Sequence, residues 1–139
     1  MSLSEVIDNR NELLAIELVN SGADVHENDD YPIARAAEYG MQTLLRLLID
    51  KGADVNSNEG YPLRMAARYG LYEIVEILVE AKAEISIRNN QPLHEAYNHH
   101  HMEVFQYLID HRADVSVLGE IPDHIKVRRL GTERSTFPY

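Results

Sequence analysis

The chain has 139 residues, of which 45% are hydrophobic, so it can fold as one domain without metals or disulfides. It has no cysteine, which excludes disulfides and thiolate metal sites, and its first residues show no signal peptide, so we expect an intracellular, cytoplasmic protein. The net charge of −10 argues against nucleic acid as a partner, and no apolar run is long enough to suggest a membrane partner.

Residues 1–30 predict a first pair of helices. Ser2 and Glu5 have the spacing of a capping box, which satisfies two backbone N–H groups at the start of a helix. Leu14 and Leu18 lie one turn apart and predict the buried stripe of a second helix. We therefore expect a helix, a tight turn and a second helix in this segment.

The next segment shows the same pattern more clearly. Pro32 has the fixed φ angle of a first helical position, and Gly40 fits the left-handed residue that commonly ends a helix. These two residues predict a short helix over about 32–39. The apolar residues that follow have helical spacing and predict a second helix over about 42–50. Turn-forming residues then lead to the next proline.

Two sequence markers recur every thirty residues, which indicates an internal repeat and predicts an all-α stack of helix pairs. The first marker is Tyr31-Pro32, Tyr61-Pro62, Gln91-Pro92 and Ile121-Pro122, and the second is Gly22-Ala23, Gly52-Ala53, Lys82-Ala83 and Arg112-Ala113. The expected units within a single domain, residues 1–139, are an N-terminal cap repeat (1–30), three repeats (31–60, 61–90, 91–120), and a partial C-terminal cap and tail (121–139) with one helix over about 122–129.

The second helices should pack through apolar residues that recur with this period, because each repeat can bury its apolar face only against its neighbours. The recurring residues are Leu14, Leu18, Leu44, Leu48, Ile74, Leu78, Val104 and Leu108. The third repeat should be strained, since Lys82 and Arg112 take the place of Gly22 and Gly52, and His100 takes the place of Gly40 and Gly70.

The segment from Pro92 to Ala96, Pro-Leu-His-Glu-Ala, resembles the Thr-Pro-Leu-His-x-Ala core of ankyrin repeats. Residues 71–79 resemble the second helix of that family, so the resemblance implies an ankyrin-repeat solenoid. The usual period is 33 residues, and the missing three residues fall in the projecting loop, which should be shortened. Similar short repeats occur in ankyrin arrays of large DNA viruses. The family's Thr–His network between loops should be largely missing, because Ala34 and Arg64 take the place of His in two repeats.

The resemblance also implies a function. Ankyrin repeats are non-enzymatic, need no cofactor, and bind other proteins on the concave face built from loops and first helices. Positions thirty residues apart form ladders on that face, and Tyr and Arg are enriched at binding hot spots. The candidate partner-binding residues are Tyr39, Tyr69, Arg68, His99, Glu38, Arg35, Tyr31 and Tyr61. The alternative is that the tyrosines are ordinary packing residues. The acidic charge suggests a partner with a basic patch.

Two further functions stay open at this point. The chain could be a structural segment of a longer ankyrin array. The run His99-His100-His101, one turn after His94, could also bind a metal, but consecutive residues at a helix end point in different directions and rarely converge on one ion. The carboxylates of Glu73, Glu76 and Glu80 should face solvent, and no catalytic motif is present.

Overall fold

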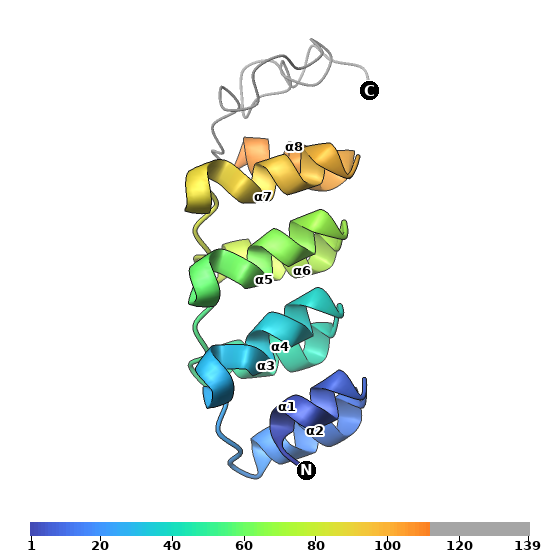
Figure 1. Cartoon of the computed structure of the whole chain (residues 1–139), viewed down its shortest axis with the longest axis vertical. Helices are drawn as coiled ribbons and strands as arrows, with labels where there is room; N and C mark the ends of the chain where they lie inside the picture. The colour runs from blue at the N-terminus through green and yellow to red at the C-terminus, as the bar shows by residue number, and fades with distance from the viewer. Residues whose placement is uncertain (112–139) are drawn as a thin grey trace.

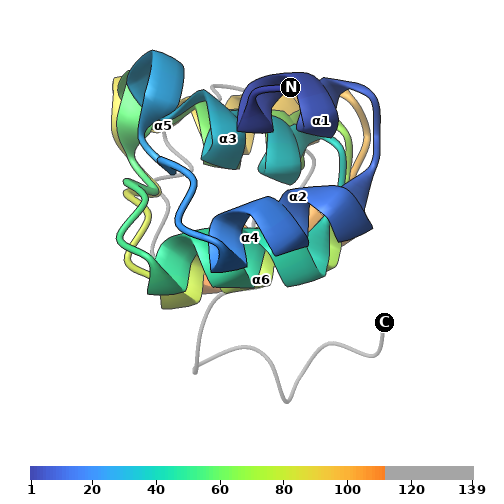
Figure 2. The same ribbon diagram turned by 90° about the horizontal axis from the view of Figure 1, so that it is seen from below.

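The computed structural model describes residues 1–111, and these form four stacked pairs of helices (Figure 1). The first helices of the pairs lie in one layer and the second helices in another (Figure 2). The helices are α1 (Leu3–Asp8), α2 (Glu12–Asn20), α3 (Glu27–Glu38), α4 (Gln42–Asp50), α5 (Ser57–Arg68), α6 (Tyr72–Glu80), α7 (Ile87–Asn98) and α8 (Met102–Asp110). The predicted all-α repeat architecture is confirmed, and residues 1–111 contain no strand.

The core lies between the two layers and continues from repeat to repeat. Among the predicted core residues, those of the second, third and fourth helix pairs are at most 2% exposed: Leu44, Leu48, Ile74, Leu78, Val104 and Leu108. Leu14 and Leu18 are only partly buried, because the first pair has a neighbour on one side only. Ala15 and Val19 are the buried residues of α2.

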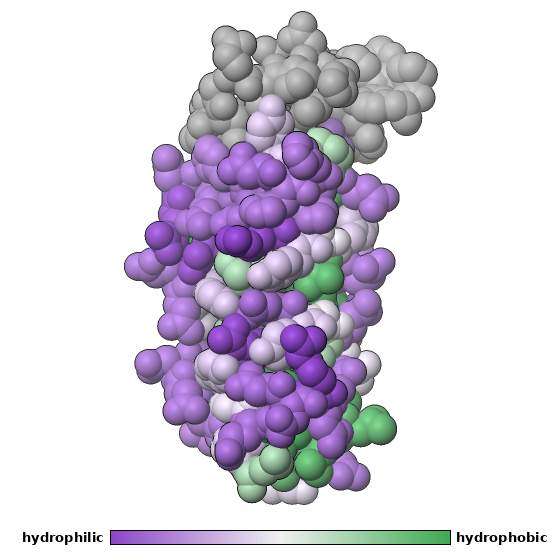
Figure 3. Space-filling model, turned by 45° about the vertical axis from the view of Figure 1, so that its right-hand side comes forward, coloured by the Kyte–Doolittle hydropathy of each residue, from purple (hydrophilic) through white to green (hydrophobic). Residues whose placement is uncertain are grey.

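The outer end of the first helix pair remains apolar. Met1 is 79% exposed, and Leu14 and Leu18 are only partly buried, whereas the equivalent Leu44 and Leu48 are buried. Figure 3 shows hydrophobic surface at the N-terminal end of the stack, whereas most of the visible surface above it is hydrophilic. A terminal cap repeat is expected to have a more polar outer face than this.

A left-handed turn precedes the right-handed part of each first helix. In α3 this turn is at 28–30, with φ between 53° and 61°, and the right-handed helix that follows agrees with the helix predicted to begin at Pro32. The same turn occurs in α5 at 58–60 and in α7 at 88–90. Asn and Asp, which supply six of these nine residues, tolerate the left-handed conformation better than most residues, and Gly60 adopts it without strain. A compact left-handed turn thus replaces the projecting loop.

The residues that replace glycine in the third repeat keep the left-handed backbone. Lys82 has a φ of 76° and His100 a φ of 64°. Arg10, which occupies the same repeat position as His100, has a φ of 63°. The predicted left-handed geometry of Lys82 and His100 is confirmed, whereas Arg112 lies outside the described residues.

The first helix begins as predicted. The backbone N–H of Ser2 donates to Glu5 Oε1 at 2.8 Å, and the backbone N–H of Glu5 donates to Ser2 Oγ at 3.2 Å, which completes the capping box. These hydrogen bonds, above all that from the Ser2 backbone, lower the pKa of Glu5. The predicted C-terminal cap, the helix over 122–129 and the tail lie outside the described residues. Within residues 1–111, no helix is long and apolar enough to cross a membrane.

Candidate functional site

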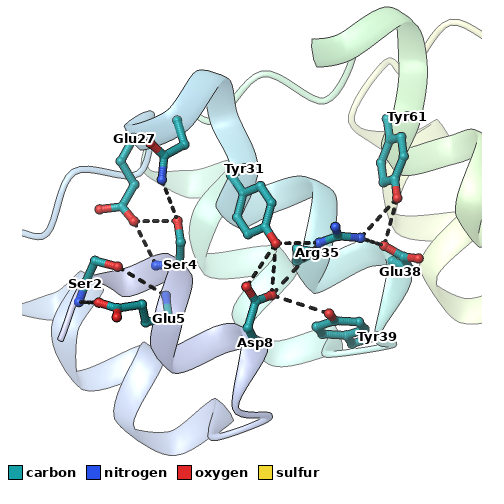
Figure 4. A network of polar contacts seen from close by, with 11 residues as sticks. Ser2, Ser4, Glu5, Asp8, Glu27, Tyr31, Arg35, Glu38, Tyr39 and Tyr61 are labelled. Atoms are coloured by element: carbon teal, nitrogen blue, oxygen red, sulfur yellow. Dashed lines mark hydrogen bonds and ion pairs between the residues drawn. The ribbon is translucent and has the colours of Figure 1, made fainter.

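The first helices carry a polar network that connects three consecutive repeats (Figure 4). Asp8 at the end of α1 accepts hydrogen bonds from Tyr31 at 2.9 Å and 3.1 Å and from Tyr39 at 3.3 Å. Arg35 lies at its centre, where its Nε donates to the Tyr31 hydroxyl at 2.8 Å and its Nη1 pairs with Glu38. Five of the predicted partner-binding residues, Tyr31, Arg35, Glu38, Tyr39 and Tyr61, belong to this network.

The network repeats one type of contact. Tyr61 donates to Glu38 Oε1 at 2.9 Å, as Tyr31 donates to Asp8. Asp8 and Glu38 are thirty residues apart, and so are the two tyrosines, so this is the same tie between repeats made twice. A tyrosine–carboxylate pair thus connects neighbouring repeats, and the Thr–His pattern is incomplete here, as the sequence predicts.

These contacts shift the pKa values of the network. Burial, followed by Asp8, raises the pKa of Tyr39, and burial, followed by the hydrogen bond to Glu38, raises the pKa of Tyr61. The hydrogen bond to Tyr31 contributes most to the raised pKa of Arg35. At neutral pH Tyr39 and Tyr61 are therefore neutral donors and Arg35 is a cation. The polar groups of the network form hydrogen bonds and ion pairs with one another, so few donors or acceptors remain for a partner.

The third junction is built differently. Arg68 occupies the repeat position of Asp8 and Glu38, and Glu95 occupies that of Arg35, so the charges are exchanged. Arg68 Nη1 lies 3.9 Å from Glu95 Oε1, and Gln91 donates to Glu95 Oε2 at 3.0 Å. The 3.9 Å pair is too long for a hydrogen bond. This junction therefore lacks the close tie of the first two.

The predicted residues at this junction are the exposed ones. Tyr69 is 49% exposed, and the side chains of Arg68 and His99 are 44% and 39% exposed. Tyr39, the equivalent of Tyr69, is half-buried, and the Arg10 guanidinium lies 3.6 Å from the centroid of its ring. The structure thus divides the predicted site into a self-bonded part near α1 and α3 and an accessible part at the ends of α5 and α7.

A cleft opens between α3 and α5 on the same side of the stack. Its volume is about 340 Å³. It is lined by Asn28, Asp29, Tyr31, Ala34, Arg35, Asn58, Tyr61 and Arg64. Sequence reasoning missed Arg64 as a functional candidate. The available signal was an arginine at the repeat position of Ala34 and His94, inside the first-helix motif.

The histidines do not come together as a metal site. Within residues 1–111, no group of three His, Cys, Asp or Glu side chains could hold a metal ion. His99 Nδ1 lies 3.0 Å from the Glu95 carbonyl oxygen, and the His101 ring packs against Gly70. The histidines therefore have separate surroundings.

A family model described as ankyrin repeats (3 copies) matches residues 3–89, and a second one, described as ankyrin repeat, matches residues 89–120. No curated protein matches the chain. The two family matches together cover the four helix pairs of the structure and continue to residue 120.

Proposed function

Because the chain belongs to the ankyrin-repeat family, whose members generally bind other proteins and are typically non-catalytic, we propose that it is a non-catalytic module that docks a partner protein on the concave, first-helix side of the stack. The centre of the proposed contact is Arg68, Tyr69 and His99, with Tyr39 at its edge. The partner carries a basic patch, which complements the acidic chain and speeds encounter more than it adds affinity.

The exposure of Tyr69 carries this proposal. An aromatic side chain that is 49% exposed contributes little to the core, yet it offers a large contact area to a partner. Among the residues that the structure describes, the one charged contact of Arg68 is the 3.9 Å approach to Glu95, so its guanidinium can rearrange toward a partner without losing a short ion pair. Tyr31, Tyr61, Arg35 and Glu38 then act mainly as a rigid support for the binding surface.

The partner is first captured from the source cell and identified by mass spectrometry. Its affinity for alanine variants of the chain is then measured. Tyr69→Ala should weaken binding by about 1–2 kcal/mol or more, in the hot-spot range, with nearly unchanged melting temperature. Arg46→Ala is the matched control, because Arg46 is an exposed arginine on α4 in the opposite layer. Rising salt should slow association. Unfolding by Tyr69→Ala, or unchanged binding after joint replacement of Tyr39, Tyr69 and His99, would show that these are packing residues.

A second candidate function is a structural segment of a longer array. The observation that favours it is the apolar outer end of the first repeat, where Leu14 and Leu18 are only partly buried. A purely structural segment makes no partner contact on the first-helix side. In that case variants of Arg68, Tyr69 and His99 should keep every interaction of the protein, whereas Leu14→Lys should weaken the packing of a neighbouring repeat.

A further inference from the structure

The cleft between α3 and α5 exists because one repeat position changes size. Ala34 is 5% exposed and lines the cleft, while Arg64 and His94 occupy the same position in the next two repeats. The small side chain leaves the space between Tyr31 and Tyr61 unfilled. A volume of about 340 Å³ is at the small end of ligand pockets and suits one side chain of a bound segment better than a large ligand.

Arg64 is the unusual residue of this cleft. It is 9% exposed, and its Nε and Nη2 donate to the backbone carbonyls of Glu59 and Asn58 at 3.0 Å and 3.1 Å. Within residues 1–111, its Nη1 donates no hydrogen bond and no carboxylate oxygen lies within 4.0 Å of it. Ser57 Oγ is the only fully buried side-chain nitrogen or oxygen atom in that range without a partner, so Nη1 keeps some accessible surface on a residue that lines the cleft.

The charge of Arg64 is poorly compensated. Burial, followed by the nearby charge of Arg88, lowers its pKa, and the carboxylates of Glu59 and Glu95 offset this effect only in part. The Tyr61 ring, whose centroid is 5.6 Å from the guanidinium carbon, attracts the cation but carries no charge. Arg35 on the other side of the cleft is paired with Glu38. A mostly buried cation that has no carboxylate within 4.0 Å is costly, and a carboxylate is the group that best complements its planar donors.

We propose that the cleft receives an Asp or Glu side chain from the bound protein segment, whose carboxylate accepts hydrogen bonds from Arg64 between Tyr31 and Tyr61. The inference rests on the proposed function, since it names the anchor that the partner inserts into the first-helix face. A partner with a basic patch can still insert one acidic side chain. Electrostatic steering depends on the field of all charges on the chain, whereas the anchor depends on the single contact with Arg64. Asp29 at the rim opposes the carboxylate and keeps the affinity of an isolated anion low.

The test needs no natural partner. Two capped peptides, acetyl-Gly-Glu-Gly-amide and acetyl-Gly-Gln-Gly-amide, are titrated into the full chain while the Nε–Hε resonance of Arg64 is followed by NMR. The Glu peptide should shift this resonance with saturation, and the Gln peptide should bind about tenfold or more weakly, because a hydrogen bond to a charged group is the stronger kind. Equal binding of the two peptides would overturn the proposal.

Two variants separate the site from the fold. Ala34→His fills the cleft with the side chain that repeat three carries at the same position, so it should abolish the Glu-dependent shift without unfolding the protein. Arg64→Gln should abolish Glu binding, and a melting curve measures any loss from the carbonyl contacts. A persistent shift in folded Ala34→His would overturn the proposal.

The remaining outcomes distinguish the anchor from the proposed function. If free Gly-Gly-Gly binds more tightly than the Glu peptide, the cleft selects a chain terminus and the side-chain assignment is wrong. If partner binding is sensitive to Tyr69→Ala but not to Ala34→His, the partner does not use the cleft and the anchor is refuted. If the Glu peptide binds the cleft while partner binding ignores Arg68 and Tyr69, the proposed docking face fails and the carboxylate site stands.

Discussion

Replacing His100 by glycine should stabilise the protein. Positions 10, 40, 70 and 100 are equivalent in the repeat, and all four have a left-handed backbone with φ between 63° and 73°. Gly40 and Gly70 adopt it without strain, but a residue with a Cβ does not. The His100 side chain is exposed and makes no hydrogen bond or ion pair within residues 1–111, so its replacement removes strain and loses little.

The magnitude follows from two opposing terms. A left-handed residue with a Cβ costs about 1–2 kcal/mol relative to glycine. The replacement by glycine also destabilises the folded protein by about 0.4–1 kcal/mol, because it increases the conformational entropy of the unfolded chain. The net gain in the free energy of unfolding should be about 0.5–1 kcal/mol. For a chain of this size the melting temperature should rise by a few degrees, on the order of 2–5 °C.

Urea denaturation followed by circular dichroism measures this difference, and Arg10→Gly is the matched control. Arg10 has nearly the same φ, but its guanidinium lies 3.6 Å from the centroid of the Tyr39 ring. A cation–π contact of about 0.5–1 kcal/mol should cancel the gain, so Arg10→Gly should be near neutral. A lower melting temperature for His100→Gly would refute the reasoning and show that His100 makes a useful contact.

Three further predictions test the core, the network and its pH dependence. Leu78→Ala should lower the free energy of unfolding by about 2–5 kcal/mol in urea melts, because Leu78 is 0% exposed, and a loss below about 1 kcal/mol would contradict the assigned packing. Tyr61→Phe should cost about 0.5–1.5 kcal/mol by removing the hydrogen bonds with Glu38 and Arg35, and a double-mutant cycle with Glu38→Gln should show coupling. The pKa of Tyr61 is raised above its usual 10.0, so the stabilisation by its neutral form is fully present below pH 10.0 and is lost as the pH rises through the folded pKa. In Tyr61→Phe the free energy of unfolding, measured across that pH range, should fall less steeply than in the unsubstituted protein.

The sequence was sufficient for the fold because the signals for it repeat. Four copies of one apolar pattern indicate the stack, and the second helix predicted at 42–50 is α4 with the same bounds. The left-handed turns were not predictable in full. Asn and Asp favour a single left-handed residue, but the run at 58–60 is supported by contacts from elsewhere. Arg64 binds its carbonyls, and Asn58 Nδ2 donates to the Asp29 carbonyl at 3.0 Å.

The candidate site was predictable by position but not by pairing. The ladder of residues thirty apart places Tyr31 and Tyr61 at equivalent positions of neighbouring repeats, whereas Asp8 was not among the predicted site residues. The bonds, however, join residues 23 apart, from the end of one first helix to the start of the next, as between Asp8 and Tyr31. A repeat alignment compares equivalent positions and therefore contains no signal for a contact between non-equivalent ones. The ion pair of Arg35 and Glu38 is different, because the two residues lie three apart on one helix and that spacing is a sequence signal for a pair.

The difference between the junctions explains why a partner should favour one end of the first-helix face. Where Tyr31 and Tyr61 meet Asp8 and Glu38, each polar group already has a short, directional bond, so a partner would have to break one to form another. At the third junction the exchanged charges leave Arg68 at 3.9 Å from its acid. A partner contact there replaces solvent rather than an internal hydrogen bond. The junction that lacks the tyrosine–carboxylate tie is thus the one best able to bind. Rebuilding that tie with Arg68→Glu, Gln91→Tyr and Glu95→Arg, which copies Asp8, Tyr31 and Arg35, should stabilise the stack while it weakens partner binding; a rise in both stability and affinity would contradict this trade-off.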